Sequence, residues 1–322
     1  MRYRALAKLE KLNRDFLIDL HGEAVVSWEV GRKEPKTVIP PYGGSAKVPA
    51  SMSSVRDESV SAVPAWVSPQ PLSARERWLL IWEIIVVFAV SLGLSAVRSL
   101  VLLIGSLTAP KALSAQHIVI NGSQAPGRPW FDLSLQLVSI ASGVAPALLV
   151  FYLLARNGER PSSIGVDASE PGRDLLRGAG LAALIGGVGL GLYILAFKSG
   201  ISLDIVAASL PDVWWRIPVL LLSALQDGIL EEVLVVGYLL SRLRLLGVSP
   251  ASAVAIAAVL RGSYHLHQGI GPFIGNVIMG VIFGVLFLRW RRTNPMIIAH
   301  TLINSVAFIG YTLLAGHVSW LP

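Results

Sequence analysis

The fold is decided by residues 133–155, which read LSLQLVSIASGVAPALLVFYLLA and contain no charged side chain. A helix needs about 20 apolar residues, at about 1.5 Å of rise per residue, to cross a bilayer. A second uncharged run of sufficient length, residues 178–197, reads GAGLAALIGGVGLGLYILAF. The two runs predict an integral membrane protein built from spanning helices.

The composition of the whole chain leads to the same interpretation. Of 322 residues, 53% are apolar and only 15% are charged, against about 25% charged in an ordinary soluble domain. The chain has no cysteine, which excludes disulfides, a cysteine nucleophile and thiolate metal sites. The net charge is +7, but the basic residues form no patch with interleaved aromatics, so nucleic-acid binding is not indicated.

Working outward from the two uncharged runs, the apolar segments predict an all-α, polytopic transmembrane helix bundle of about seven spans. The expected spans are residues 78–104, 133–155, 178–197, 217–240, 253–268, 270–288 and 295–315. Residues 1–76 are rich in proline, serine and charges of both signs, which is typical of a disordered tail. Residues 77–212 would then hold the first three helices, and residues 213–322 the remaining four.

The basic residues of the loops alternate between many and few along the chain. The positive-inside rule places the loops with more Lys and Arg in the cytoplasm. With seven spans, this pattern predicts a multi-pass protein of the cell membrane with a cytoplasmic N-terminus and the C-terminus outside. Glu83 and Arg98 lie near the ends of the first span, where long charged side chains reach the headgroups.

Three carboxyl groups lie near the middle of the fourth span, where a charge costs several kcal/mol. Asp227 and Glu231 are four residues apart and share one helix face, and Glu232 follows directly. Two adjacent glutamates in such a place cannot both be ionised cheaply, so at least one is expected to be protonated or to meet a cation. Intramembrane carboxylates of this kind mark function.

The later spans supply further polar side chains. After Glu232 the chain has no Asp or Glu, so the only expected buried partner of Arg261, on the fifth span, is the carboxyl cluster. His265 lies four residues after Arg261, and His267 points elsewhere. On the seventh span, His300 and Asn304 are four residues apart and share a face.

These residue types suit more than one chemistry. A glutamate with a neighbouring histidine can deprotonate a water and return the proton to a leaving amine. A second histidine and an asparagine can donate hydrogen bonds to the oxyanion of a tetrahedral intermediate. Glu231, His265 and His300 could instead hold a zinc ion, which needs three protein ligands and an open position, although there is no HExxH motif.

The fourth, fifth and seventh spans resemble the CPBP family, which comprises CAAX proteases, bacteriocin-processing enzymes and abortive-infection proteins. The family pattern is Glu-Glu-x-x-x-Arg, then Phe-x-x-x-His, then His-x-x-x-Asn. This chain supplies Glu231-Glu232, His265, and His300 with Asn304, and the resemblance covers roughly residues 213–316.

The resemblance implies an intramembrane endopeptidase whose partners are the lipid bilayer and a peptide or protein substrate at the membrane. It makes residues 213–322 the catalytic core, assigns Glu231 and His265 to water activation, and assigns His300 and Asn304 to the oxyanion. The family is often labelled metalloprotease, and the metal-free interpretation fits the residues equally well, so the cofactor expectation is none or zinc.

Two positions depart from the family pattern. Val236 stands where the family has arginine, and Arg261 stands where it has phenylalanine. Our hypothesis is that the cation has moved from the fourth helix to the fifth, where Arg261 pairs with Glu232 and leaves Glu231 free for protonation.

Two other functions stay open from the residues. A non-catalytic relative acting as a membrane scaffold or bacteriocin-immunity protein is mildly favoured by the loss of arginine at position 236. A proton-coupled transporter would also use buried Glu and His side chains as a relay.

Overall fold

The computed structural model describes residues 72–318, which belong to one compact unit. The expected tail therefore lies outside the described residues, except for its last few positions. The first described helix, α2, begins at Ala74, three residues before the expected boundary.

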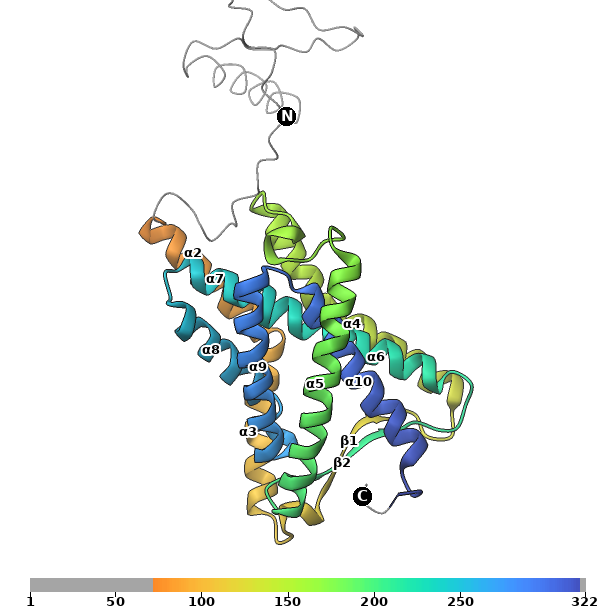
Figure 1. The fold of residues 1–322 in the computed structure, drawn as a ribbon. Helices are drawn as coiled ribbons and strands as arrows, with labels where there is room; N and C mark the ends of the chain where they lie inside the picture. The colour runs from red at the N-terminus through yellow and green to blue at the C-terminus, as the bar shows by residue number, and fades with distance from the viewer. Residues whose placement is uncertain (1–71, 319–322) are drawn as a thin grey trace, which may run out of the picture. The chain divides into compact units, whose positions relative to one another are not determined.

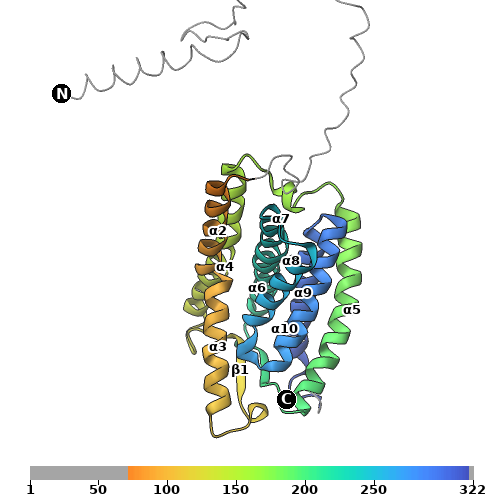
Figure 2. The ribbon, with the colours of Figure 1, turned by 90° about the vertical axis from the view of Figure 1, so that its left-hand side faces the viewer.

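The described chain is a helix bundle, as the sequence predicts (Figures 1 and 2). Its helices are α2 (Ala74–Ala89), α3 (Leu92–Thr108), α4 (Pro129–Arg156), α5 (Pro171–Lys198), α6 (Arg216–Glu231), α7 (Leu240–Leu245), α8 (Pro250–Ser263), α9 (Ile270–Trp290) and α10 (Asn294–Leu314). A π-helical segment, η3 (Glu232–Leu239), joins α6 to α7. Short 3₁₀ turns are η1 (Leu113–Ala115), η2 (Pro161–Ile164) and η4 (Leu266–Gln268).

The expected count of seven spans is not confirmed. Among the described residues, four helices are long and apolar enough to cross a membrane, namely α4, α5, α9 and α10, and α2 with α3 adds a fifth if that bent pair is one span. The fifth expected span is the shortest, because α8 has only 14 residues and reaches about 21 Å against a hydrocarbon core of about 30 Å.

The first expected span is broken between α2 and α3, which meet at an angle of 52°. Gly93 makes this bend sterically possible, because a Cβ there would lie 2.6 Å from the carbonyl oxygen of Phe88. Glu83 does not simply reach the headgroups as expected. Its carboxylate accepts a hydrogen bond from the Tyr238 hydroxyl at 3.0 Å and lies 3.4 Å from the Arg242 guanidinium, so it is paired inside the bundle.

A small parallel sheet is the element that the sequence analysis missed. Strand β1 (His117–Gly122) pairs with β2 (Asp204–Ser209), with His117 opposite Asp204. Both strands lie in connections between apolar runs and carry β-branched residues, which favour extended backbone. Just before β2, the Leu203 amide donates to the Gln268 carbonyl at 3.1 Å, which ties the sheet to the turn after α8.

Helix α10 packs closely against α5 and α6 in the middle of the bundle (Figure 2). The contacts rest on small residues, as is usual between membrane helices. A Cβ at Gly228 of α6 would lie 2.5 Å from the Thr301 hydroxyl oxygen, and one at Gly178 of α5 would lie 2.6 Å from the Ile298 side chain. The outer faces are apolar instead, with Leu176 of α5 76% exposed, as expected for surfaces that meet lipid.

A polar cluster joins the loop before α5 to the turn before α10. The Arg292 guanidinium donates to both carboxylate oxygens of Asp174, at 2.7 and 2.6 Å, and to Asp167 Oδ1 at 3.0 Å. Burial works against ionisation of Asp167, but hydrogen bonds from Ser169 and the contact with Arg292 outweigh it and lower the pKa of this carboxyl.

The close approach at Gly228 predicts that Gly228→Ala destabilises the protein. Because Thr301 and the backbone of Ile297 leave no room for a Cβ, the α6–α10 contact must open, at about 1–3 kcal/mol. Thermal unfolding in detergent measures the loss. Gly189→Ala in α5 is the matched control, because a Cβ there meets nothing within 4 Å, and an equal loss in both variants would contradict the packing argument.

The Asp167 ion pair predicts a loss of stability in acid. Since the folded pKa lies below the unfolded value of about 3.9, the stabilisation is fully present above that value. It is lost as the pH falls through the lowered folded pKa. Asp167→Asn should therefore be less stable than wild type at pH 7, and the difference should shrink below about pH 4. A difference independent of pH in melting experiments would show that the charge of Asp167 contributes nothing.

Candidate active site

The carboxyl cluster lies where α-helix α6 continues into the π-helical segment η3. Glu231 is the last residue of α6 and Glu232 the first of the π-helical segment η3. Glu231 is 7% exposed and Glu232 is fully buried. π-helical turns are frequent at functional sites, and here the π-helical segment begins at the second of the two adjacent glutamates.

Arg261 pairs with Glu232, as our hypothesis requires. Its two terminal nitrogens donate to the two carboxylate oxygens of Glu232 at 3.0 and 2.5 Å, and both side chains are fully buried. Gly280 lets α9 pack closely against the part of α8 that carries Arg261, because a Cβ there would lie 2.8 Å from the Ala258 Cα. Glu231 is not wholly free of the cation, since Arg261 Nη2 also lies 3.4 Å from its Oε2.

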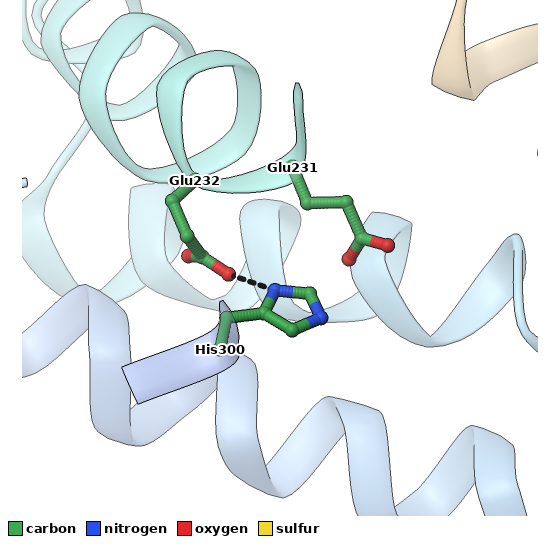
Figure 3. Close-up of side chains that lie close together, drawn as sticks. All are labelled: Glu231, Glu232 and His300. Carbon is green, nitrogen blue, oxygen red and sulfur yellow. Dashed lines mark hydrogen bonds and ion pairs between the residues drawn. The ribbon is translucent and has the colours of Figure 1, made fainter. Parts of the chain in front are cut away.

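His300 lies between the two carboxylates (Figure 3). Its Nδ1 is 2.7 Å from Glu232 Oε1 and 3.0 Å from Arg261 Nη2. A carboxylate only accepts and a guanidinium only donates. The protonation state of the ring therefore decides which of these two neighbours is hydrogen-bonded to Nδ1.

His265 lies just beyond helix α8, whereas the sequence analysis placed it within the fifth helix. Helix α8 ends at Ser263, and i to i+3 hydrogen bonds follow, from the His265 amide to Gly262 and from the Gln268 amide to His265. The side chain still reaches the cluster, with Nε2 at 3.7 Å from Glu231 Oε2. This nitrogen is buried and has no hydrogen-bond partner among residues 72–318.

Asn304 and Asp227 meet one turn away from the glutamates. The Asn304 amide donates to Asp227 Oδ2 at 3.2 Å, and the Gln226 amide donates to Asp227 Oδ1 at 3.3 Å. Asn304 and His300 lie on neighbouring turns of α10, as their spacing predicts. His267 faces elsewhere, as expected, with Nδ1 at 3.0 Å from the Ser99 hydroxyl of α3.

Tyr264 belongs to this cluster and was not found from the sequence. Its hydroxyl donates to Glu231 Oε2 at 2.7 Å, and its side chain is buried. The available signal was its place, three residues after Arg261 and directly before His265. In the sequence, a tyrosine at this place is typical of an interfacial aromatic residue. In the structure, the turn after α8 directs its side chain into the cluster.

The site so assembled corresponds to the part of the chain that matches a known family. Residues 213–306 match the family model described as Type II CAAX prenyl endopeptidase Rce1-like. This segment is Rce1-like. The match covers less than a third of the chain and contains every site residue described above. No curated protein and no solved structure matches the chain.

The Rce1-like segment confirms the family resemblance and supports a membrane endopeptidase of the CAAX protease type. Position 236, where the family pattern has arginine, is occupied by Val236. This side chain lies in η3 and is buried in the hydrophobic core. In place of the family arginine, Arg261 brings a guanidinium to Glu232 from the facing helix. The buried carboxylate is therefore neutralised despite the substitution.

The group of Glu231, Glu232 and His300 fits a metal ion poorly. Ligand atoms of Glu231, Glu232 and His300 lie within 4.8 Å of one another, whereas the set expected from the sequence had His265 in place of Glu232. Arg261 already donates to both oxygens of Glu232. A divalent cation at these three side chains would lie beside a buried guanidinium and compete with it for the same carboxylate.

The buried pair predicts that Arg261→Ala and Glu232→Gln are damaging to a similar degree. Removing either partner leaves an uncompensated charge in an apolar interior, which costs about 3–5 kcal/mol. Thermal unfolding in detergent and yield of folded protein measure this. Arg289→Ala, at an exposed position of α9, is the control. Wild-type stability of Arg261→Ala would show that the cation does not serve Glu232.

Proposed function

We propose that this protein is an intramembrane endopeptidase that hydrolyses a peptide bond with a water activated by Glu231 and His265. The observation that supports this most directly is the gap of 3.7 Å between His265 Nε2 and Glu231 Oε2. It is too long for a hydrogen bond, and the His265 nitrogen is buried without a hydrogen-bond partner among residues 72–318, so a water beside the pair would satisfy it. Such a water would meet a carboxylate that can accept its proton.

In the proposed reaction, the water oxygen attacks the carbonyl carbon of the substrate while Glu231 takes one proton from the water. The tetrahedral intermediate then collapses, the carbon–nitrogen bond breaks, and the proton held by Glu231 passes to the leaving amine. The products are a carboxylic acid and an amine. General base and general acid roles of this kind typically contribute about 10²–10⁴ in rate.

The oxyanion of that intermediate needs donors, and α10 offers two. The His300 Nε2 atom carries a hydrogen and serves as a donor either when Arg261 donates to Nδ1, or when the ring is doubly protonated and Nδ1 donates to Glu232. The Asn304 amide has two N–H groups, and its contact with Asp227 uses one of them. Asp227 thus orients the amide and leaves the second N–H for the oxyanion. Donors of this kind typically contribute about 10²–10³ each.

In this proposal, Arg261 and Glu232 form a fixed ion pair beside the catalytic residues and do not take part in proton transfer. The pair keeps Glu232 from acting as a second base and holds His300 through Nδ1. No step of this proposal passes through a metal. The substrate is a peptide or protein that reaches the site from the bilayer. The proposed orientation has the N-terminus in the cytoplasm and the C-terminus outside.

The protease proposal predicts cleavage by the purified protein in detergent or nanodiscs. The assay uses transmembrane reporter peptides and a prenylated C-terminal peptide, with fragments identified by mass spectrometry. Glu231→Gln and His265→Ala should each lower the rate at least ~100-fold, because each removes a group that activates the water. Glu170→Gln, in the loop before α5, is the control and should leave the rate unchanged.

Three outcomes would contradict this proposal. Cleavage that survives Glu231→Gln would exclude the general base. Cleavage lost on chelation and restored by zinc would overturn the metal-free mechanism. A wild-type protein that cleaves none of these peptides, or that drives proton-linked uptake into liposomes, would favour the scaffold or transporter alternatives.

A further inference from the structure

Tyr264 lies at the junction between α8 and the η4 turn, one residue before His265. Its ring is 4.8 Å from the His265 ring, with the planes at 46°. Its hydroxyl donates to Glu231 Oε2 at 2.7 Å, a normal length for an O–H···O hydrogen bond. A hydrogen bond to an ionised acceptor is roughly twice as strong as one between neutral groups.

Three polar groups from one short segment converge on the same carboxylate oxygen. Glu231 Oε2 is 2.7 Å from the Tyr264 hydroxyl, 3.4 Å from Arg261 Nη2 and 3.7 Å from His265 Nε2. Only the Tyr264 contact has hydrogen-bond length. Tyr264 is therefore the group that anchors Oε2 and so fixes the orientation of the whole carboxylate.

The position of Tyr264 is itself fixed by a helix far away in the sequence. The Ser99 hydroxyl of α3 donates to the Tyr264 carbonyl oxygen at 2.8 Å in a buried contact. The backbone of the turn after α8 is thus held against α3, and the phenol extends from there to α6. A chain of two hydrogen bonds connects the first part of the bundle to the carboxylate of Glu231.

From this geometry we infer that Tyr264 is a positioning residue that orients the Glu231 carboxylate toward the water and the scissile carbonyl. The inference rests on the proposed function and deepens it. Tyr264 acts through Glu231 and need not touch the substrate. Its loss should therefore slow the chemical step without weakening substrate binding.

The test compares Tyr264→Phe with Tyr238→Phe. Tyr238 is the matched control, because it is also a buried tyrosine that donates to a glutamate, Glu83, at 3.0 Å, but outside the site. Tyr264→Phe should lower kcat about 10–100-fold, as a misplaced catalytic group does, with KM unchanged. Tyr238→Phe should leave kcat unchanged, although both variants lose a buried hydrogen bond and some thermal stability.

A second measurement does not depend on activity. The Tm shifts of Tyr264→Phe and Glu231→Gln should be non-additive in the double variant, because the two side chains share one interaction. The shifts of Tyr238→Phe and Glu231→Gln should add. Additive shifts for Tyr264 and Glu231, or an unchanged kcat in Tyr264→Phe, would overturn the inference and leave the protease proposal intact. An inactive wild-type protein would instead overturn the proposed function, and with it the catalytic role of Tyr264.

Discussion

The site depends on a charge pair that an apolar interior cannot tolerate in any other form. Glu232 and Arg261 are both fully buried and share two hydrogen bonds. Either charge alone would be very costly in this surrounding. The pair therefore fixes the distance between η3 and α8, and His300 of α10 joins it through one ring nitrogen. Three helices are thus brought together at one point.

Close helix packing brings the residues of the charge pair and His300 within hydrogen-bond distance. Gly228 lets α10 approach α6, and Gly280 lets α9 approach the part of α8 that carries Arg261. Without hydrophobic attraction between helices in lipid, small residues and polar contacts must provide the association. The π-helical segment after Glu231 completes the arrangement, since its buried residues Glu232–Leu239 continue the helix to α7 with altered winding.

The sequence predicted the parts of this protein that follow from periodicity and from the cost of buried charge. The apolar runs predicted α4, α9 and α10 to within four residues at each end, although α5 begins seven residues earlier than expected. The absence of later acids led directly to the Arg261–Glu232 pair. A single glycine within an apolar run is compatible with a continuous helix, so the bend at Gly93 was not predicted. The parallel strands and the end of α8 before His265 depend on contacts between distant segments, which no local pattern encodes. Tyr264 escaped notice for the same reason, since its role depends on a turn held by Ser99.

The hydrogen bond between Leu203 and Gln268 has a consequence for how the protein can be divided. The turn that carries His265 is held by the connection before β2 on one side and by Ser99 of α3 on the other. Both supports lie upstream of residue 213, where the match to the family begins. A fragment trimmed to the matched residues would keep the reactive groups but lose both of these hydrogen bonds. A fragment that keeps the geometry of the turn must therefore extend back at least to α3.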